Sequence, residues 1–271
     1  MSDSFVSKMY IDTRLKTVDS ASNSDFRFQL NRSAYMPEGS TFCIDEKNIP
    51  YAWNTKEAGI NDKLYIGWQL TIPDQLVFTV LTVPSKRYNG QELADQLQVQ
   101  LSVVANGSWT VVYDATGNNM IFSANLAAFK IFTDEDLAVS TGFVGIDKKN
   151  PESINDILQI SGRSDDMINK YLLPFKTGFL NLLNYQDLYL TSANLGNFEV
   201  LGVRGEGSVI RKICVSAGWG YSIIDRLSWD SDKTSCSKLA LSTLDFQLRD
   251  VKGRIVPLHG AHISFTSKFP N

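Results

Sequence analysis

Two histidines, His259 and His262, are the side chains of this sequence best suited to bind a transition metal or to transfer a proton near neutral pH. They lie three residues apart in a segment that we expect to be strand-like, where alternation would direct them to opposite faces. A shared metal would therefore require a carboxylate and a third ligand from other strands, and the sequence indicates neither. We predict no catalytic, cofactor-binding or metal-binding residues, no cofactor and no enzymatic activity.

Other patterns associated with catalysis or nucleotide binding are equally weak. The chain has no Gly-x-Ser-x-Gly segment that would present an activated serine. Its glycine-rich stretch, residues 202–208, lacks the Gly-Lys-Ser/Thr ending of a phosphate-binding loop and leads into a strand-like run at 209–215. No helix N-terminus can then lie under a phosphate, so we interpret the stretch as a turn between strands.

The cysteines and tryptophans are interpreted mainly as core residues. Cys43, Cys214 and Cys236 are an odd number at wide spacing, which is typical of a reducing compartment, and we expect them to be small buried apolar groups. Indole rings can stack on sugars or bases, but most of them lie in or beside alternating segments that we assign to the core. The tryptophans are Trp53, Trp68, Trp109, Trp219 and Trp229.

The composition is that of a folded protein. Of 271 residues, 43% are hydrophobic, which is enough to fill a sizeable core. The net charge is −3 and the 26 lysines and arginines are scattered, so we predict no nucleic-acid binding. The sequence shows neither a long apolar run nor a signal-like start, so we expect no transmembrane segment and no export by that route.

Alternation of apolar and polar residues predicts that β-strands are the prevailing element. In the clearest examples, Phe26 alternates with Phe28 and Leu30, and Phe246 lies between Leu244 and Leu248. Each set is expected to point to one face of its strand. The predicted strands are residues 8–12, 25–30, 41–45, 63–70, 76–81, 109–113, 120–123, 129–132, 186–190, 209–215, 221–224, 241–248 and 261–265.

One segment changes to a helical period. Residues 91–101 place Leu93, Leu97 and Leu101 four apart on one face, and Ala94 joins this stripe. Asn89 precedes the segment and Glu92 follows it by three residues, which is the spacing of a capping box. Short helices are also expected at 133–137 and 154–160.

The many strands and the single helical module predict an antiparallel β-sandwich that is interrupted by an insertion. We predict that residues 1–74 form the first part of the sandwich and 171–271 the second part. An α+β module occupies 75–147, and 148–170 connects it to the second part. No internal repeat suggests a propeller or a solenoid.

Four local patterns, taken in order, resemble the minor capsid, or penton, proteins of double-jelly-roll DNA viruses, including virophages, Polinton-like elements and larger eukaryotic relatives. The first joins Tyr-Ile-Asp-Thr-Arg at 10–14 to Asn-Ser-Asp-Phe-Arg-Phe-Gln-Leu at 23–30. The second is Tyr-Asn-Gly-Gln-Glu-Leu at 88–93, before the helix and hairpin. The third runs from Leu-Tyr-Leu-Thr-Ser at 188–192 through Arg-Gly at 204–205 to Val-Ile-Arg-Lys-Ile at 209–213. The fourth joins Leu-Asp-Phe-Gln-Leu-Arg-Asp at 244–250 to Leu-His-Gly at 258–260.

The resemblance implies a single jelly roll that stands upright in an icosahedral shell, with five copies closing a vertex and the inserted module facing outward or toward neighbours. The expected partners are further copies in a homopentamer, the major capsid protein of the same virus and a vertex fibre. The expected location is the virion, assembled inside the host cell. Such a ring uses two different faces of each subunit and needs no catalytic residue.

Two other functions fit a β-sandwich. A receptor- or glycan-binding module of a virion spike would use the loops around Trp53 and Trp219 as stacking platforms. A cupin-like or hydrolytic enzyme would require a bound metal or measurable turnover. The fold alone does not decide among these three functions.

Overall fold

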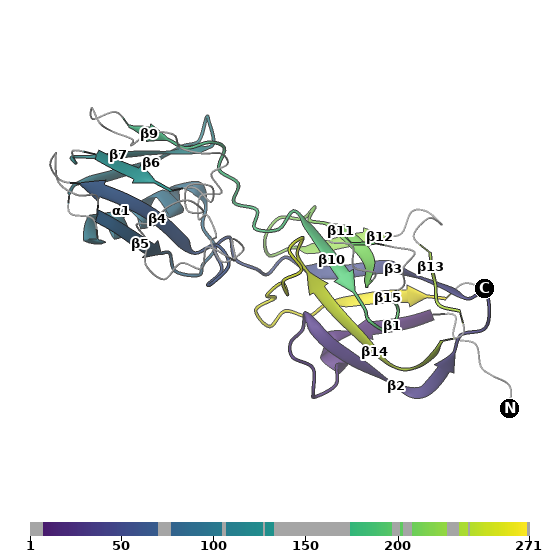
Figure 1. The fold of residues 1–271 in the computed structure, drawn as a ribbon. Coiled ribbons are helices and arrows are strands. Elements are labelled where there is room, and N and C mark those ends of the chain that lie inside the picture. Colours follow the sequence, from purple (N-terminus) through teal and green to yellow (C-terminus); the bar gives the residue numbers. More distant parts are fainter. Residues whose placement is uncertain are drawn as a thin grey trace. The chain divides into compact units, whose positions relative to one another are not determined.

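The computed structural model describes residues 8–69, 77–104, 107–126, 128–132, 174–196, 201–202, 208–226, 233–237 and 239–269 (Figure 1). The chain divides into two compact units, each considered by itself below. Met1–Trp53 and Tyr185–Asn271 together form unit 1, and Asn54–Asn184 forms unit 2.

Unit 1 consists of two antiparallel sheets. The first contains, in hydrogen-bonded order, β1 (Lys8–Asp12), β15 (Ser264–Lys268), β3 (Thr41–Pro50) and β12 (Ser222–Arg226), and β13 (Thr234–Ser235) also pairs with β3. The second contains β11 (Val209–Cys214), β10 (Asp187–Thr191), β14 (Ala240–Arg249) and β2 (Asp25–Tyr35). A short 3-10 helix, η1 (Thr13–Leu15), follows β1.

The path of the chain through these sheets is that of a jelly roll. The chain passes from one sheet to the other after β1, β2 and β3, and it does so again after β11, β13 and β14. Among the described strands of unit 1, β10 and β11 follow each other within one sheet as an antiparallel pair, and β12 and β13 follow each other within the other sheet, where both pair with β3. The predicted mainly-β, antiparallel jelly-roll sandwich is thus confirmed, and unit 2 lies between β3 and β10 in the sequence.

The inner faces of the sheets form one apolar core. Alternation buries Leu244, Phe246 and Leu248 completely, as predicted. The Phe246 ring centroid lies 5.5 Å from that of Phe26 and 4.9 Å from that of Phe265. Because Phe26 and Phe246 come from β2 and β14, and Phe265 from β15, this aromatic cluster joins the two sheets.

Unit 2 has two smaller sheets, one helix and its own core. One sheet has the order β5 (Val77–Thr82), β4 (Lys63–Gln69), β8 (Ala128–Ile131). The other has the order β6 (Trp109–Asp114), β7 (Asn119–Ala124), β9 (Phe175–Lys176). The helix α1 (Gly90–Val104) contributes Leu93, Leu97 and Leu101 to a core that contains no residue of unit 1. Within the described residues, no helix is both long and apolar enough to span a membrane.

The start of α1 confirms the predicted capping box. The backbone N–H of Glu92 donates to Oδ1 of Asn89 at 2.8 Å, and the backbone N–H of Asn89 donates to Oε2 of Glu92 at 2.9 Å. Gly90 is required for space, since a Cβ at this position would lie 2.5 Å from the ring of Tyr113. The Tyr-Asn-Gly segment therefore both caps the helix and lets it approach β6 closely.

The predicted boundaries of the insertion were wrong. Unit 2 spans 54–184 and not 75–147, because β4 pairs with β5 and β8 and because β9 pairs with β7. Alternation identifies the strand at 63–69 but carries no information about its partners. The predicted connection at 148–170 and the short helices at 133–137 and 154–160 lie outside the described residues.

Three strands also differ from prediction in their extent. β2 and β3 continue to Tyr35 and Pro50, well past the alternating cores at 25–30 and 41–45. The last strand begins at Ser264 and not at residue 261, because the backbone N–H of Ala261 closes a turn onto the carbonyl of Leu258. Pairing with neighbouring strands, which the sequence does not display, sets these limits.

Replacement of Phe246 by alanine tests the role of the aromatic cluster. Phe246 is 0% exposed, so Phe246→Ala should lower the free energy of unfolding by about 3–5 kcal/mol. Val251→Ala, at a position that is 50% exposed, is the control and should change it by less than about 0.5 kcal/mol. Chemical denaturation monitored by fluorescence measures both, and equal effects of the two substitutions would contradict the assigned core.

Candidate functional site

The two histidines do not form a shared site. His259 lies in a turn with a φ of 46°, and His262 lies between that turn and β15, so neither occupies the predicted strand. Nδ1 of His262 lies 3.2 Å from Oγ1 of Thr13 and 3.3 Å from Nδ2 of Asn23. The His262 side chain therefore connects the segment before β15 to the segment after β1 through these two contacts. Within the described residues, no group of three or more potential metal ligands comes together.

Trp53 does not form a stacking platform, contrary to the glycan-binding alternative. It is 0% exposed, with its ring centroid 4.3 Å from that of Tyr51 and 5.6 Å from that of Tyr185. Trp219 is 41% exposed, and its Nε1 donates to the carbonyl of Trp53 at 3.2 Å. The neighbouring aromatic rings bury Trp53 in the core, as expected for most of the tryptophans, whereas the glycan-binding alternative would require it to be accessible.

The remaining tryptophans and the glycine-rich stretch follow the predictions as far as they are described. Trp68 and Trp109 are buried in the core of unit 2, as predicted. Trp229 and residues 203–207 lie outside the described part of the chain. Val209 begins β11 directly after that stretch, as expected for a turn that leads into a strand.

The cysteines differ in exposure. Cys43 and Cys236 are buried as predicted, but Cys214 is exposed, so the prediction for this residue was wrong. Alternation along β11 directs Ile213 into the core and Cys214 to the outer face of the sheet. Burial raises the pKa of the Cys236 thiol to about 11 and also raises the pKa of Cys43. No disulfide links any of the three.

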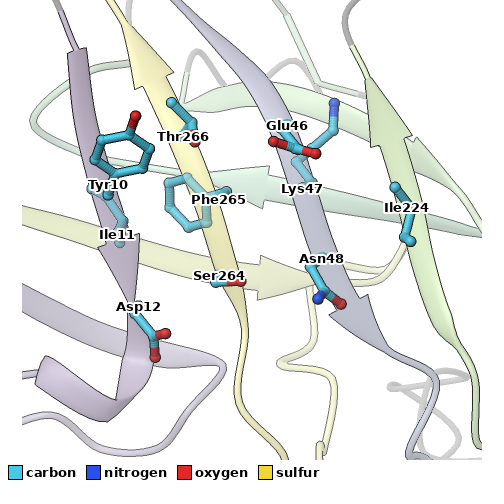
Figure 2. A pocket seen from close by; sticks show the side chains of 10 residues that line it. All are labelled: Tyr10, Ile11, Asp12, Glu46, Lys47, Asn48, Ile224, Ser264, Phe265 and Thr266. Carbon is cyan, nitrogen blue, oxygen red and sulfur yellow. The ribbon is translucent and has the colours of Figure 1, made fainter.

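The most distinctive surface of unit 1 is the outer face of the sheet β1-β15-β3-β12, which we call the Tyr10 face. It contains a shallow groove of about 380 Å³ that crosses all four strands (Figure 2). Strand register places Asp12, Ser264, Asn48 and Ile224 in one row across the sheet. Tyr10 lies opposite Thr266 in the neighbouring row.

Three polar side chains of this groove have no hydrogen-bond partner among the described residues. Thr266 is only 5% exposed and lines the groove, yet within the described residues its hydroxyl makes no hydrogen bond. The side chains of Asn48 and Ser264 likewise make none to the described part of the chain.

The charged side chains that line the groove are the carboxylates of Asp12 and Glu46 and the ammonium of Lys47, a residue that is 1% exposed. Hydrogen bonds from the Arg14 guanidinium lower the pKa of Asp12, so this carboxylate is ionised at neutral pH. Glu46 contributes a second carboxylate from β3. Nearer the end of the sheet, Lys268 forms an ion pair with Asp45 at 2.7 Å.

The outer face of the second sheet has a different character. Its polar side chains bind one another or nearby backbone groups, as in the 2.9 Å ion pair between Lys212 and Asp187. Asp245 accepts hydrogen bonds from the backbone N–H groups of residues 193 and 194, at 2.8 and 2.9 Å. We call this surface the Lys212 face, and Cys214 lies on it.

The Tyr10 face combines polar and exposed apolar side chains. Its groove combines an exposed aromatic ring and an exposed aliphatic side chain with hydroxyl and amide groups, and aromatic residues are enriched in protein contact surfaces. It contains no histidine or cysteine, and so no nucleophile paired with an imidazole base.

Comparison with known proteins identifies a similar fold. No protein-family model matches the chain, and it has no significant match among curated proteins. Among solved structures, the mavirus penton protein is similar, with a TM-score of 0.53 and 9% sequence identity. The match covers 97% of this chain and 99% of that chain. It therefore extends over both units and shows a common fold.

Sequence reasoning missed the Tyr10 face. The buried side chains of Met9 and Ile11 imply by alternation that Tyr10 points outward, so this residue could have been found from β1 alone. Thr266 and Ile224 could not, because they approach Tyr10 only through the pairing of strands from distant parts of the chain.

The exposure of the cysteines predicts selective thiol labelling of the native full-length chain. At pH 8, Cys214 should react rapidly with a maleimide, whereas Cys43 and Cys236 should react only in denaturant. With a pKa of about 11, Cys236 is ionised in about one molecule per thousand at this pH. Mass spectrometry of the labelled protein counts the adducts, and Cys214→Ser is the control. Rapid addition of two or three labels to the native chain would contradict the assigned burial.

Proposed function

We propose that this chain is a non-enzymatic structural subunit of an icosahedral virus capsid, and that five copies form a vertex capsomer. The observation that carries the proposal is the fold likeness to the mavirus penton protein over nearly the whole of both chains. A fold can host several functions, so the proposal also needs support from the surface. The groove on the Tyr10 face has the composition of a contact surface and no catalytic constellation.

The jelly roll of unit 1 accounts for how the subunit would assemble. Its two sheets present two chemically different outer faces, which is what a ring of identical subunits needs, since each copy touches its neighbours through two different surfaces. Unit 2, with a core of its own, interrupts the chain between β3 and β10 and leaves the pairing of these strands intact. It would be available for contacts with other capsid components.

The proposed partners follow from this role. They are further copies of the chain, the major capsid protein of the same virus and, at the vertex, a fibre. The proposed location is the virion, after assembly in the host cell. The net charge of −3 supports contacts with protein and not with the genome.

Electron microscopy of the purified full-length chain tests the proposal. Class averages should show closed rings with five-fold symmetry, because a heterologous contact with the correct rotation closes on itself. Single particles of monomer size at every protein concentration, together with specific binding on a glycan array, would contradict the vertex role. They would instead favour the receptor-binding function.

A further inference from the structure

The chain crosses between the two units twice, from Trp53 to Asn54 and from Asn184 to Tyr185. On the unit 1 side, the rings of Trp53 and Tyr185 are in edge-to-face contact, with their centroids 5.6 Å apart. Both side chains are buried in the core of unit 1. The jelly roll therefore holds the two crossing points together with its own residues.

The departure of the chain from β3 is also fixed within unit 1, by the loop that precedes β12. The backbone N–H of Tyr51 donates to the carbonyl of Tyr221 at 2.9 Å, and that of Gly220 donates to the carbonyl of Tyr51 at 3.0 Å. Nε1 of Trp219 donates to the carbonyl of Trp53 at 3.2 Å. All of these groups belong to unit 1, so no residue of unit 2 is needed for this geometry.

On the unit 2 side, asparagine amides join the same two crossing points. Nδ2 of Asn184 donates to the carbonyl of Asn54 at 3.3 Å, and Nδ2 of Asn61 donates to Oδ1 of Asn184 at 3.2 Å. The Asn61 amide also donates to the carbonyl of Thr55 at 2.9 Å and accepts from the backbone N–H of Glu57 at 2.8 Å. We call Asn54, Asn61 and Asn184 the amide clasp, because they connect the first and last residues of unit 2.

The amide clasp lies in a segment that is polar and yet buried. Thr55, Glu57 and Asn61 are 7%, 4% and 5% exposed. The Glu57 carboxylate accepts from the backbone N–H of Asn54 at 2.7 Å and from the hydroxyl of Ser85 at 3.1 Å. A buried network of this kind adds less stability than apolar packing of similar volume would, but it allows few arrangements. The network therefore serves to fix the position of the two ends of unit 2.

We propose that unit 2 is an independently folding module that the amide clasp closes on itself, and that it can unfold and refold while the jelly roll of unit 1 stays intact. The two cores share no residue, and each unit holds its own side of the crossings. An unfolded insertion costs the jelly roll only loop-closure entropy, which rises slowly with loop length. Separate units of this kind let one part of a chain open while the other keeps its fold. The inference goes beyond the proposed function and does not depend on it.

Native-state hydrogen exchange of the full-length chain, read by mass spectrometry of its peptides, tests the independence of the units. Leu97→Ala, at a position in α1 that is 0% exposed, should accelerate exchange of the protected amides of unit 2 at least about tenfold and leave those of unit 1 unchanged. Phe246→Ala should have the reverse effect. Even complete unfolding of unit 2 by Leu97→Ala decides the question, because unit 1 should then keep its protection.

A double-mutant cycle with the same measurement tests the clasp. Asn61→Ala and Asn184→Ala should each accelerate exchange in unit 2, but the double variant should show clearly less than the product of the two effects, since either substitution breaks the bond that the two residues share. Asn181→Ala is the matched control. The amide of Asn181 accepts from the backbone N–H of Leu183 at 2.9 Å and takes no part in the clasp, so its effect should multiply with that of Asn61→Ala.

The outcomes decide each part of the inference. Faster exchange in both units after either Leu97→Ala or Phe246→Ala would overturn independent folding. Effects of Asn61→Ala and Asn184→Ala that multiply as those of the control do would overturn the clasp. Neither result bears on the vertex role, which ring formation tests separately.

Discussion

The structure depends on the burial of alternating apolar side chains between two antiparallel sheets that are assembled from both ends of the chain. β1 pairs with β15 through the register Lys8 to Lys268, and β2 pairs with β14. Phe26, Phe246 and Phe265 then meet in the centre although they are far apart in sequence. Because these pairings hold the two ends together, the chain between β3 and β10 can leave the sandwich and return without disturbing it.

The burial of one face of every strand also determines which surfaces of unit 1 can have a function. Alternation that buries one face of every strand leaves the other face to solvent or to a partner, so a jelly roll has two extended outer faces. In unit 1 both faces contain ion pairs, Lys212 with Asp187 on one and Arg14 with Asp12 on the other. On the Tyr10 face, the side chains of Thr266, Ser264 and Asn48 make no hydrogen bond to the described part of the chain.

Local features were predictable from the sequence and long-range ones were not. The strand at 8–12, the helix with its Asn89 and Glu92 cap, and the burial of Phe246 all follow from the spacing of nearby residues. The extent of the insertion was not predictable, because the partners of a strand are absent from its pattern. The exposure of Cys214 follows from its phase in β11, whereas the number and spacing of the cysteines had suggested burial. The groove was not predictable either, since four strands from three regions of the chain compose it.

The most direct test of the central claim, that this chain closes rings with its own copies, is its native mass across a range of protein concentrations. A subunit of 30.3 kDa that closes in fives should reach a plateau at about 150 kDa and grow no further. A mass that stays at 30.3 kDa, or one that keeps increasing as in an open filament, would contradict the claim.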